Sequence, residues 1–197
     1  MSHNIETELK VLLSKEEFER LAHHFNLSSE PTIIQRNTYY DTNNLSLKLA
    51  NTALRLRNFA ASSEWTIKQR QDAFRSLELN QTNALPILPV PSEITKTDIH
   101  SQDLLSFLSS HQIDLTALKQ TYDIMTERWN VVSEVGEYAL DRSHFLDTTD
   151  YELEFETEDL ELAQQTFKKL LEQLNISYQP APTKISRAVQ YAAQKSD

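Results

Sequence analysis

Short segments in which charged and apolar residues alternate constrain this chain more than any other feature of its sequence. In "NIETELKVLL", Glu6, Glu8 and Lys10 occupy every second position, with Thr7 and Leu9 between them. Successive side chains of a β-strand point to opposite faces of the sheet. The segment therefore predicts a strand with one ionic face and one largely apolar face.

The same alternation recurs in four later segments, "LRLR", "WTIK", "RSLELN" and "ELEFE". Their ionic residues are Arg55, Arg57, Lys68, Glu78, Glu152, Glu154 and Glu156. An antiparallel sheet with one solvated face would also produce this pattern, and alternation alone does not exclude that explanation. The separation of the charges by sign favours a more specific arrangement, because like charges stacked along one strand are destabilising unless something compensates them.

A closed antiparallel barrel is such an arrangement. If the ionic faces point inward, the acids can converge on a divalent cation and the bases on an anion, while closure removes the sheet edges. The apolar faces then point outward, where helices with apolar stripes cover them. Because buried charge is costly without ligands, the pattern predicts an α+β fold whose charged interior binds a metal and a polyanion.

The remaining elements can be placed by their periodicity. Besides the opening strand, strands are expected at residues 33–42, 51–59, 64–71, 75–81, 118–132, 137–145 and 148–157. Helices are expected at residues 14–25, 101–110, 160–174 and 184–195. The first helix opens with a capping box at Ser14 and Glu17. A chain of 197 residues is long enough for one domain with a sizeable core, or at most two small ones, and we expect one domain over residues 1–197.

Composition excludes several kinds of site. A net charge of -10 does not favour a protein that binds nucleic acid through a broad basic surface. The absence of cysteine excludes a thiol nucleophile, a thiolate zinc site and disulfides. The single glycine, Gly136, excludes the glycine-rich loops that cradle phosphates. Any phosphate must therefore be held by side chains.

The sequence also bears on location. Its N-terminus lacks a basic stretch followed by an apolar one, and no run approaches the ~18 apolar residues of a membrane span. We expect a cytoplasmic protein that binds neither nucleic acid nor membrane. The oligomeric state is not predicted.

The two kinds of ionic face suit complementary ligands. Glutamate oxygens are hard ligands that suit Mg²⁺ or Mn²⁺. Arginine and lysine suit phosphate, arginine through its planar fork and lysine as a compact charge. Together they indicate polyphosphate chemistry, in which a metal and cations stabilise charge during attack on a phosphoryl group.

These segments, taken in order, resemble a known family. The motifs are E-x-E-x-K in "IETELK", then "YYDT", "LRLR", "WTIK", "ERW" with Arg128, "LDR" with Asp141, "ELEFE", and "TKISR" with Lys184 and Arg187. The set is similar to CYTH-domain proteins of the triphosphate tunnel metalloenzyme superfamily. The resemblance spans Ile5 to about Tyr191.

The resemblance implies an eight-stranded antiparallel tunnel that binds a triphosphate with Mg²⁺ or Mn²⁺. It implies metal ligands at Glu6, Glu8, Glu154 and Glu156. It implies catalytic roles for Glu6, Glu8, Asp141, Glu152 and Lys184. It implies substrate contacts from Lys10, Arg55, Arg57, Lys68, Glu78, Arg128, Lys184 and Arg187. One position departs from the pattern: Asn80 stands where a second acid is frequent, and Glu78 can instead pair with a tunnel arginine.

The leading functional hypothesis is hydrolysis of inorganic triphosphate. Thiamine triphosphatase and adenylate cyclase are the alternatives within the family, and no basic-aromatic platform for a base is evident. A polyphosphate- or nucleotide-binding module without catalysis, or a scaffold protein, are alternatives from other classes. Phosphate release from triphosphates, with metal or chelator, separates these possibilities.

Several of these residues also have simpler explanations. Asp141 stands near a turn, and Lys184 and Arg187 near a helix start, where such residues are commonly structural or exposed. Tyr39 and Tyr40 are expected to pack in the core. The paired His23 and His24 are expected on the surface, late in the first helix.

Overall fold

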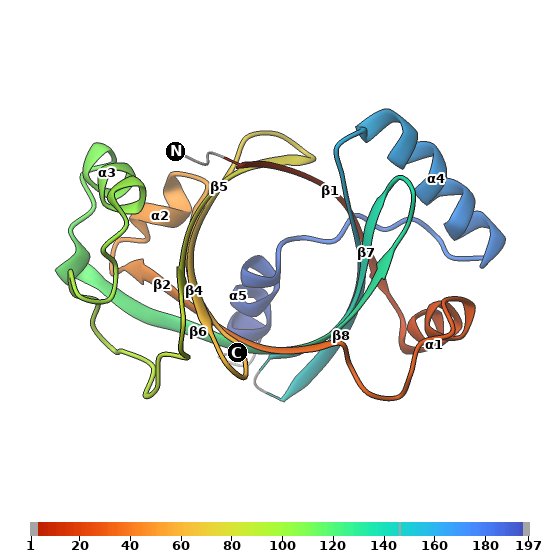
Figure 1. Ribbon diagram of the computed structural model, residues 1–197, viewed down its shortest axis with the longest axis horizontal. Helices are drawn as coiled ribbons and strands as arrows, with labels where there is room; N and C mark the ends of the chain where they lie inside the picture. Colours follow the sequence, from red (N-terminus) through yellow and green to blue (C-terminus); the bar gives the residue numbers. More distant parts are fainter. Residues whose placement is uncertain (1–3, 146, 195–197) are drawn as a thin grey trace. The chain divides into compact units, whose positions relative to one another are not determined.

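The computed structural model describes residues 4–145 and 147–194, and its eight strands form a closed antiparallel barrel in the order β1-β5-β4-β3-β2-β6-β7-β8 (Figure 1). The strands are β1 (Asn4–Leu13), β2 (Ile33–Thr42), β3 (Thr52–Asn58), β4 (Ser63–Arg70), β5 (Arg75–Asn83), β6 (Leu118–Val132), β7 (Gly136–Phe145) and β8 (Thr148–Thr157). The predicted barrel is confirmed.

Five α-helices accompany the strands in the described residues. They are α1 (Lys15–His24), α2 (Ser46–Leu49), α3 (Gln102–Ser110), α4 (Leu160–Gln173) and α5 (Lys184–Gln194). A 3₁₀ turn (Leu115–Ala117) precedes β6. The predicted end of the last helix, Lys195, lies outside the described residues. No helix in the described part of the chain combines the length and apolar character that a membrane crossing requires.

The chain divides into two compact units. The first contains Gln35–Asp123 and therefore β3, β4, β5, α2 and α3 with most of β2. The second contains Glu6–Ile34 and the chain from Ile124 onward, and therefore α1, β7, β8, α4 and α5 with most of β1. The expectation of a single domain over residues 1–197 stays a prediction.

In the first unit, the apolar faces of β3 and β4 form the core. The register places Leu54 opposite Ile67 and Leu56 opposite Trp65, and all four side chains are fully buried. They belong to one cluster with residues of α2, α3 and the connector before α3. Because side chains alternate along each strand, Arg55, Arg57 and Lys68 lie on the opposite face, which the helices do not cover.

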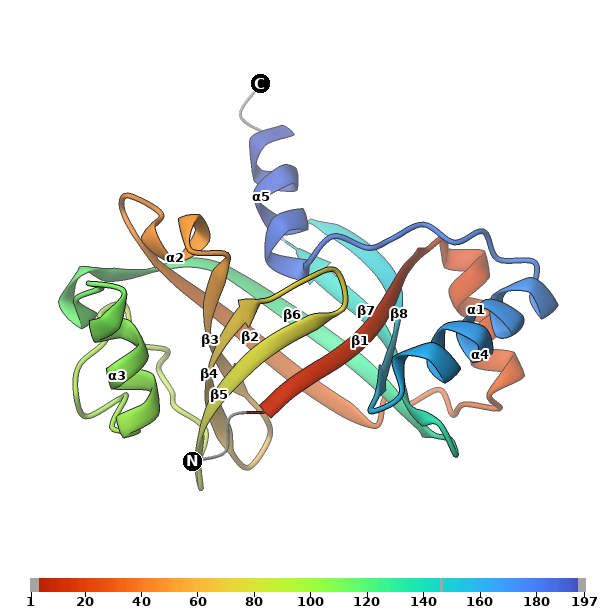
Figure 2. The same ribbon diagram turned by 90° about the horizontal axis from the view of Figure 1, so that it is seen from above.

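In the second unit, α1 packs against β7 and β8, and α4 packs against β8 (Figures 1 and 2). The register places Phe155 of β8 opposite both Leu9 and Tyr138. The ring of Phe155 also stacks on Phe167 of α4, with 6.1 Å between centroids. Phe18 of α1 contacts Tyr151 at 5.0 Å. The glutamates that alternate with these residues occupy the other face.

Gly136 begins β7 at a point where the neighbouring backbone leaves no room for a side chain. A Cβ atom added there would lie 2.1 Å from the carbonyl oxygen of Glu156 in β8. Only glycine permits this close approach. The chain's single glycine therefore serves the pairing of β7 with β8, at the predicted turn after β6.

Two helix starts differ in how well the sequence predicts them. The capping box of α1 is confirmed, because Ser14 accepts a hydrogen bond from the backbone N–H of Glu17 and its own N–H donates to the Glu17 carboxylate. The short α2 was not predicted. Its first turn is held by Asp41, whose carboxylate accepts hydrogen bonds from the N–H groups of Leu47 and Lys48. This contact assigns a structural role to the aspartate of "YYDT".

The two tyrosines of that motif are buried, as predicted. Tyr40 is 2% exposed, packs on Trp65 with 5.2 Å between ring centroids, and donates its hydroxyl hydrogen bond to the carbonyl of Pro91. Tyr39 is 7% exposed. Tyr40 belongs to the core cluster of the first unit, whereas Tyr39 stands opposite Arg55 in the β2–β3 register.

Candidate functional site

Strand register brings the ionic residues of the second unit together. Asp141 of β7 pairs with Glu152 of β8 on one side and with Arg128 of β6 on the other. Lys10 of β1 pairs with Glu154 of β8. Directly opposed residues in an antiparallel pair share a face. Segments that are far apart in the sequence thus contribute neighbouring side chains to a single ionic cluster.

Three carboxylates form the centre of this cluster. Asp141, Glu152 and Glu154 each offer one oxygen, and these atoms all lie within 4.8 Å of one another. Asp141 is completely buried and Glu152 is 1% exposed. We call these three residues the acidic triad. It combines a residue expected to bind metal, Glu154, with two expected to be catalytic.

Arg128 neutralises two members of the acidic triad. Its Nε and Nη2 atoms donate to the two oxygens of Asp141, at 2.8 and 2.6 Å, and Nη2 also donates to Glu154 at 2.6 Å. Burial disfavours the charged forms of Arg128 and Asp141, but the attraction between the two charges outweighs this effect of burial. The pKa of Arg128 is raised well above its usual value, and the Arg128 guanidinium and the Lys184 ammonium hold the pKa of Asp141 below its usual value.

Lys10 lies at the edge of the triad, between two glutamates. Its Nζ is 3.0 Å from an oxygen of Glu8 and 3.0 Å from Glu154. Burial lowers the pKa of Lys10, but the carboxylates of Glu154 and Glu8 outweigh this and raise the pKa above its usual value. The E-x-E-x-K lysine is therefore an ammonium cation bound to carboxylates.

Lys184, the first residue of α5, reaches the middle of the triad. Its Nζ lies 2.8 Å from Asp141 and 3.0 Å from Glu154, and it also contacts Glu152. Burial lowers the pKa of Lys184 well below its usual value, although the Asp141 carboxylate opposes this change. The contact with Glu154 is a hydrogen bond donated by Nζ, and the contacts with Asp141 and Glu152 are ion pairs.

Arg187 fixes α5 to β8. Its Nε donates to Asp150 at 2.7 Å, and its Nη1 lies 3.0 Å from Glu152 and donates to the carbonyl of Pro182. The side chain is 2% exposed. The structure thus places this guanidinium in a buried set of protein contacts, and the substrate contact implied for Arg187 stays a prediction.

Three other residues implied as metal ligands lie further along the same strands. Glu8 and Glu156 oppose each other in the β1–β8 register, Glu156 is exposed, and Glu6 is half-buried two residues before Glu8. They are not members of the acidic triad found in the described residues. Their roles stay predictions.

The acidic triad has the properties that a divalent metal requires. Both carboxylate oxygens of Glu152 are buried and accept no hydrogen bond within residues 4–145 and 147–194, and ion pairs with Lys184 and Arg187 compensate their charge. Carboxylate oxygens are hard donors of the kind that Mg²⁺ and Mn²⁺ prefer. The residues present therefore fit such a metal.

The first unit carries the predicted basic residues on one face. Arg55 donates from Nη2 to the Thr66 hydroxyl at 3.3 Å, and Lys68 lies 3.3 Å from Glu78. Burial raises the pKa of Glu78, but Lys68 and then Arg55 outweigh this and hold the pKa below its usual value. Glu78 therefore forms its ion pair with Lys68, and Arg55 and Arg57 have weaker electrostatic effects on it. Asn80, opposite Thr66 in the register, is exposed.

Asn37 is a member of this face that sequence reasoning missed. Its Oδ1 accepts a hydrogen bond from Nε of Arg57 at 2.9 Å, which fixes the amide so that Nδ2 points elsewhere. Asn37 is 1% exposed. Among the described residues, its Nδ2, the Nε of Arg55 and the Nε2 of Gln35 are buried atoms without a hydrogen-bond partner. Buried donors without partners are rare, and here they indicate a place for an anion.

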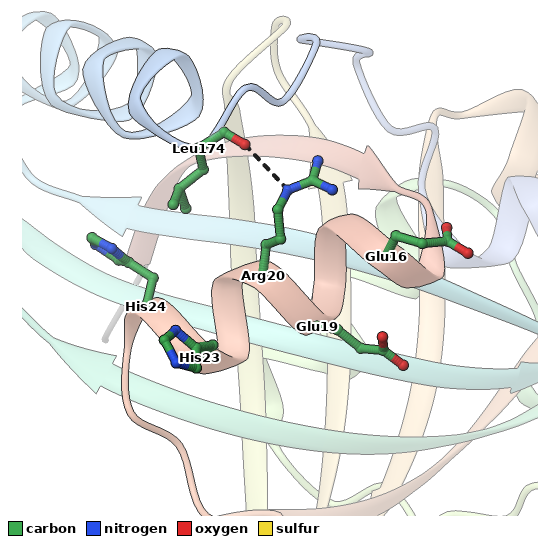
Figure 3. Close-up of a pocket in the computed structure, with 6 residues that line it drawn as sticks. All are labelled: Glu16, Glu19, Arg20, His23, His24 and Leu174. Carbon is green, nitrogen blue, oxygen red and sulfur yellow. Dashed lines mark hydrogen bonds between the residues drawn. The ribbon is translucent and has the colours of Figure 1, made fainter.

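A surface pocket of about 510 Å³ lies elsewhere in the second unit, between α1 and the end of α4. Figure 3 shows Arg20 directed at the backbone carbonyl of Leu174, to which it donates a hydrogen bond at 3.2 Å. Glu16 and Glu19 add negative charge to the lining. This combination does not suit a phosphate. The lining also contains His23 and His24, which are exposed as predicted.

Known proteins are similar to this chain over nearly their whole length. YjbK of Bacillus subtilis (strain 168), named as a candidate triphosphatase, is 32% identical over 190 residues, which cover 95% of each chain. The crystal structure of a Bacillus halodurans protein described as a candidate adenylate cyclase has a TM-score of 0.81 and 33% identity, covering 95% of this chain and 98% of that one.

A more distant structure has the same fold. The Hippeastrum protein HpAC1, described as a candidate adenylyl cyclase with a dominant triphosphatase activity, has a TM-score of 0.72 and 17% identity, covering 94% of this chain and 95% of that one. The model of the CYTH domain family matches residues 4–189. The chain therefore belongs to the CYTH domain family.

Proposed function

We propose that this protein is a divalent-metal-dependent triphosphatase, with inorganic triphosphate as its substrate. The observation that carries the proposal is the acidic triad, in which the buried oxygens of Glu152 accept no hydrogen bond. Membership of the CYTH family and the name of the Bacillus subtilis relative support the reaction class.

The acidic triad would hold Mg²⁺ or Mn²⁺, with Glu6, Glu8 and Glu156 as further proposed ligands from β1 and β8. A bound divalent cation neutralises phosphate charge and orients the phosphoryl group for in-line attack. A metal there would add to the compensation that the basic residues give the buried carboxylates, whose charge is costly to bury.

The basic residues have a separate task. In the second unit, Lys10 and Arg128 would bind phosphate oxygens and keep the carboxylates oriented. In the first unit, the proposed phosphate ligands are Arg55, Arg57 and Lys68, with Glu78 positioning Lys68. Fixed cations in a desolvated site stabilise developing charge without reorganising, which is the main source of catalysis in phosphoryl transfer.

A panel of triphosphates tests the proposal and its alternatives. We expect phosphate release from inorganic triphosphate with Mg²⁺ or Mn²⁺ and none with chelator. Faster turnover of thiamine triphosphate would assign that substrate instead, and pyrophosphate with cyclic AMP from ATP would assign the cyclase reaction. Tight binding without turnover under every metal would indicate a binding module, and neither binding nor turnover would leave a scaffold role.

Asn37→Asp tests the anion site of the first unit. Aspartate is nearly isosteric and keeps a partner for Arg57, but it replaces the unpartnered donor by an acceptor and adds negative charge. We expect KM for triphosphate to rise about tenfold or more, since a lost hydrogen bond to a charged group is worth at least that factor, with melting temperature unchanged or higher. Asn44→Asp, which adds the same charge in the exposed turn before α2, is the control. Equal KM values in the two variants would remove Asn37 from the site.

The remaining expectations concern partners and location. The net charge of -10 supports the expectation that nucleic acid is not a partner. We propose that the protein acts on a small-molecule triphosphate in the cytoplasm.

A further inference from the structure

The ammonium group of Lys184 lies where the proposed metal would bind. It contacts one oxygen from each member of the acidic triad, at 2.8 Å for Asp141 and 3.0 Å for Glu154, with Glu152 as the third partner. These are the same three residues whose oxygens lie within 4.8 Å of one another. The positive charge of the lysine thus compensates the triad in the structure described here.

A lysine ammonium and a divalent cation cannot share these three oxygens. Mg²⁺ binds oxygen at about 2.0–2.1 Å, so an ion bound to the triad would lie well within 4 Å of an ammonium that keeps its present contacts. Like charges at that separation in a desolvated site repel strongly. One cation must leave before the other can bind.

We propose that Lys184 is a resident counter-ion of the acidic triad, which a divalent cation must displace in order to bind. The inference rests on the proposed function, because it concerns the metal of that same site. It assigns Lys184 a role in setting metal affinity, in addition to the catalytic and phosphate-binding roles expected from the sequence.

The exchange requires only a side-chain movement. α5 is held to the β7–β8 hairpin by three contacts that do not involve Lys184. Arg187 donates to Asp150 at 2.7 Å, Tyr191 donates to the same carboxylate at 3.2 Å, and the Arg187 guanidinium lies 5.7 Å from the ring centre of Phe145. Lys184 stands at the first position of the helix, and its four-carbon stem is flexible. The ammonium can therefore leave the triad while the helix stays in place.

Displacement links the metal to the substrate. A metal that arrives alone must leave the lysine charge without a carboxylate partner, so its affinity is low. A metal that arrives with triphosphate provides phosphate oxygens that the released ammonium can bind. Each ligand then raises the affinity for the other by the same factor, as linkage requires. In this way the triad remains compensated with and without substrate, and free metal alone is held weakly.

Calorimetric titration of Mn²⁺ in the absence of triphosphate tests the inference without any activity assay. Lys184→Met is expected to bind Mn²⁺ about tenfold or more tightly than wild type, because close charge pairs are worth at least that factor. Lys184→Arg retains the charge and should bind Mn²⁺ as weakly as wild type. Lys168→Met, which removes an exposed lysine from α4, controls for net charge. Lys184→Gln replaces Met if circular dichroism shows that the Met variant is unfolded.

The same titration is repeated with a nonhydrolysable triphosphate present. Wild type should gain Mn²⁺ affinity from the triphosphate, and Lys184→Met should gain less. If Lys184→Met and wild type bind Mn²⁺ equally without triphosphate, the inference is wrong while the proposed metal site stands. If no variant binds Mn²⁺ with or without triphosphate, both the inference and the proposed function are wrong.

Discussion

Replacing Glu154 by glutamine should lower metal-dependent phosphate release more than about 100-fold, since even the outer-shell partners of a metal cost 10–100-fold when mutated. Glu154 contacts Lys10, Arg128 and Lys184 at 2.6 to 3.0 Å. The substitution keeps the shape of the side chain, removes its charge and replaces one acceptor oxygen by an amide donor. Steady-state release of phosphate from inorganic triphosphate at saturating Mn²⁺ measures the effect.

Two matched variants make this result specific. Glu161→Gln removes an exposed charge in the first turn of α4 and should leave turnover unchanged. Glu156→Gln removes the next glutamate on the same face of β8, which is exposed and outside the acidic triad, and we expect a smaller loss than for Glu154. Wild-type turnover in a folded Glu154→Gln protein would contradict the assignment of the triad.

Arg55→Ala is the second substitution with a large expected effect. Arg55 has a buried Nε without a hydrogen-bond partner and lies on the basic face of the first unit. Hydrogen bonds to charged groups are worth enough that triphosphate affinity should fall about 10- to 100-fold. The rise in melting temperature produced by a fixed triphosphate concentration should shrink accordingly, because that rise follows ligand affinity by mass action.

The control for this variant is an arginine on the other face of the same sheet. Arg36 of β2 is exposed and pairs with Asp123, so Arg36→Ala removes an equal charge from a surface ion pair of small energetic value. We expect its ligand-induced shift to match wild type. If Arg55→Ala keeps the full shift as well, Arg55 does not bind the substrate.

Alternation predicted the ionic and apolar faces of several strands. The predicted strands at 33–42 and 118–132 coincide with β2 and β6, and the first of them was indicated by its branched and aromatic residues. The short helix α2 escaped prediction because it depends on Asp41, whose side chain caps N–H groups six and seven residues later. Such a cap depends on the conformation of the turn that brings Asp41 to these N–H groups, and the periodicity of the sequence does not predict that conformation.

The sequence predicted most residues of the candidate site, but it predicted few of the contacts among them. The spacing of Glu152 and Glu154 places them on one face, but only the register of β8 against β7 shows that Asp141 lies beside Glu152. The family resemblance implied a site role for Lys184, but no periodicity in the sequence places its side chain against these acids. Its position depends on the anchoring of α5 by Arg187, which is a tertiary contact. The sequence likewise did not predict a role for Asn37, because its proposed role in anion binding depends on an amide nitrogen that only the structure shows to be without a partner among the described residues.

The placement of a divalent metal in the acidic triad is the claim from which the rest follows. Anomalous diffraction at the manganese edge, from crystals soaked with Mn²⁺ and a nonhydrolysable triphosphate, tests it most directly. The account predicts an anomalous peak bonded to carboxylate oxygens of Asp141, Glu152 and Glu154 and to phosphate oxygens, with Lys184 moved off the triad. A triphosphate-bound peak at another location, with Lys184 still on the three carboxylates, would contradict it.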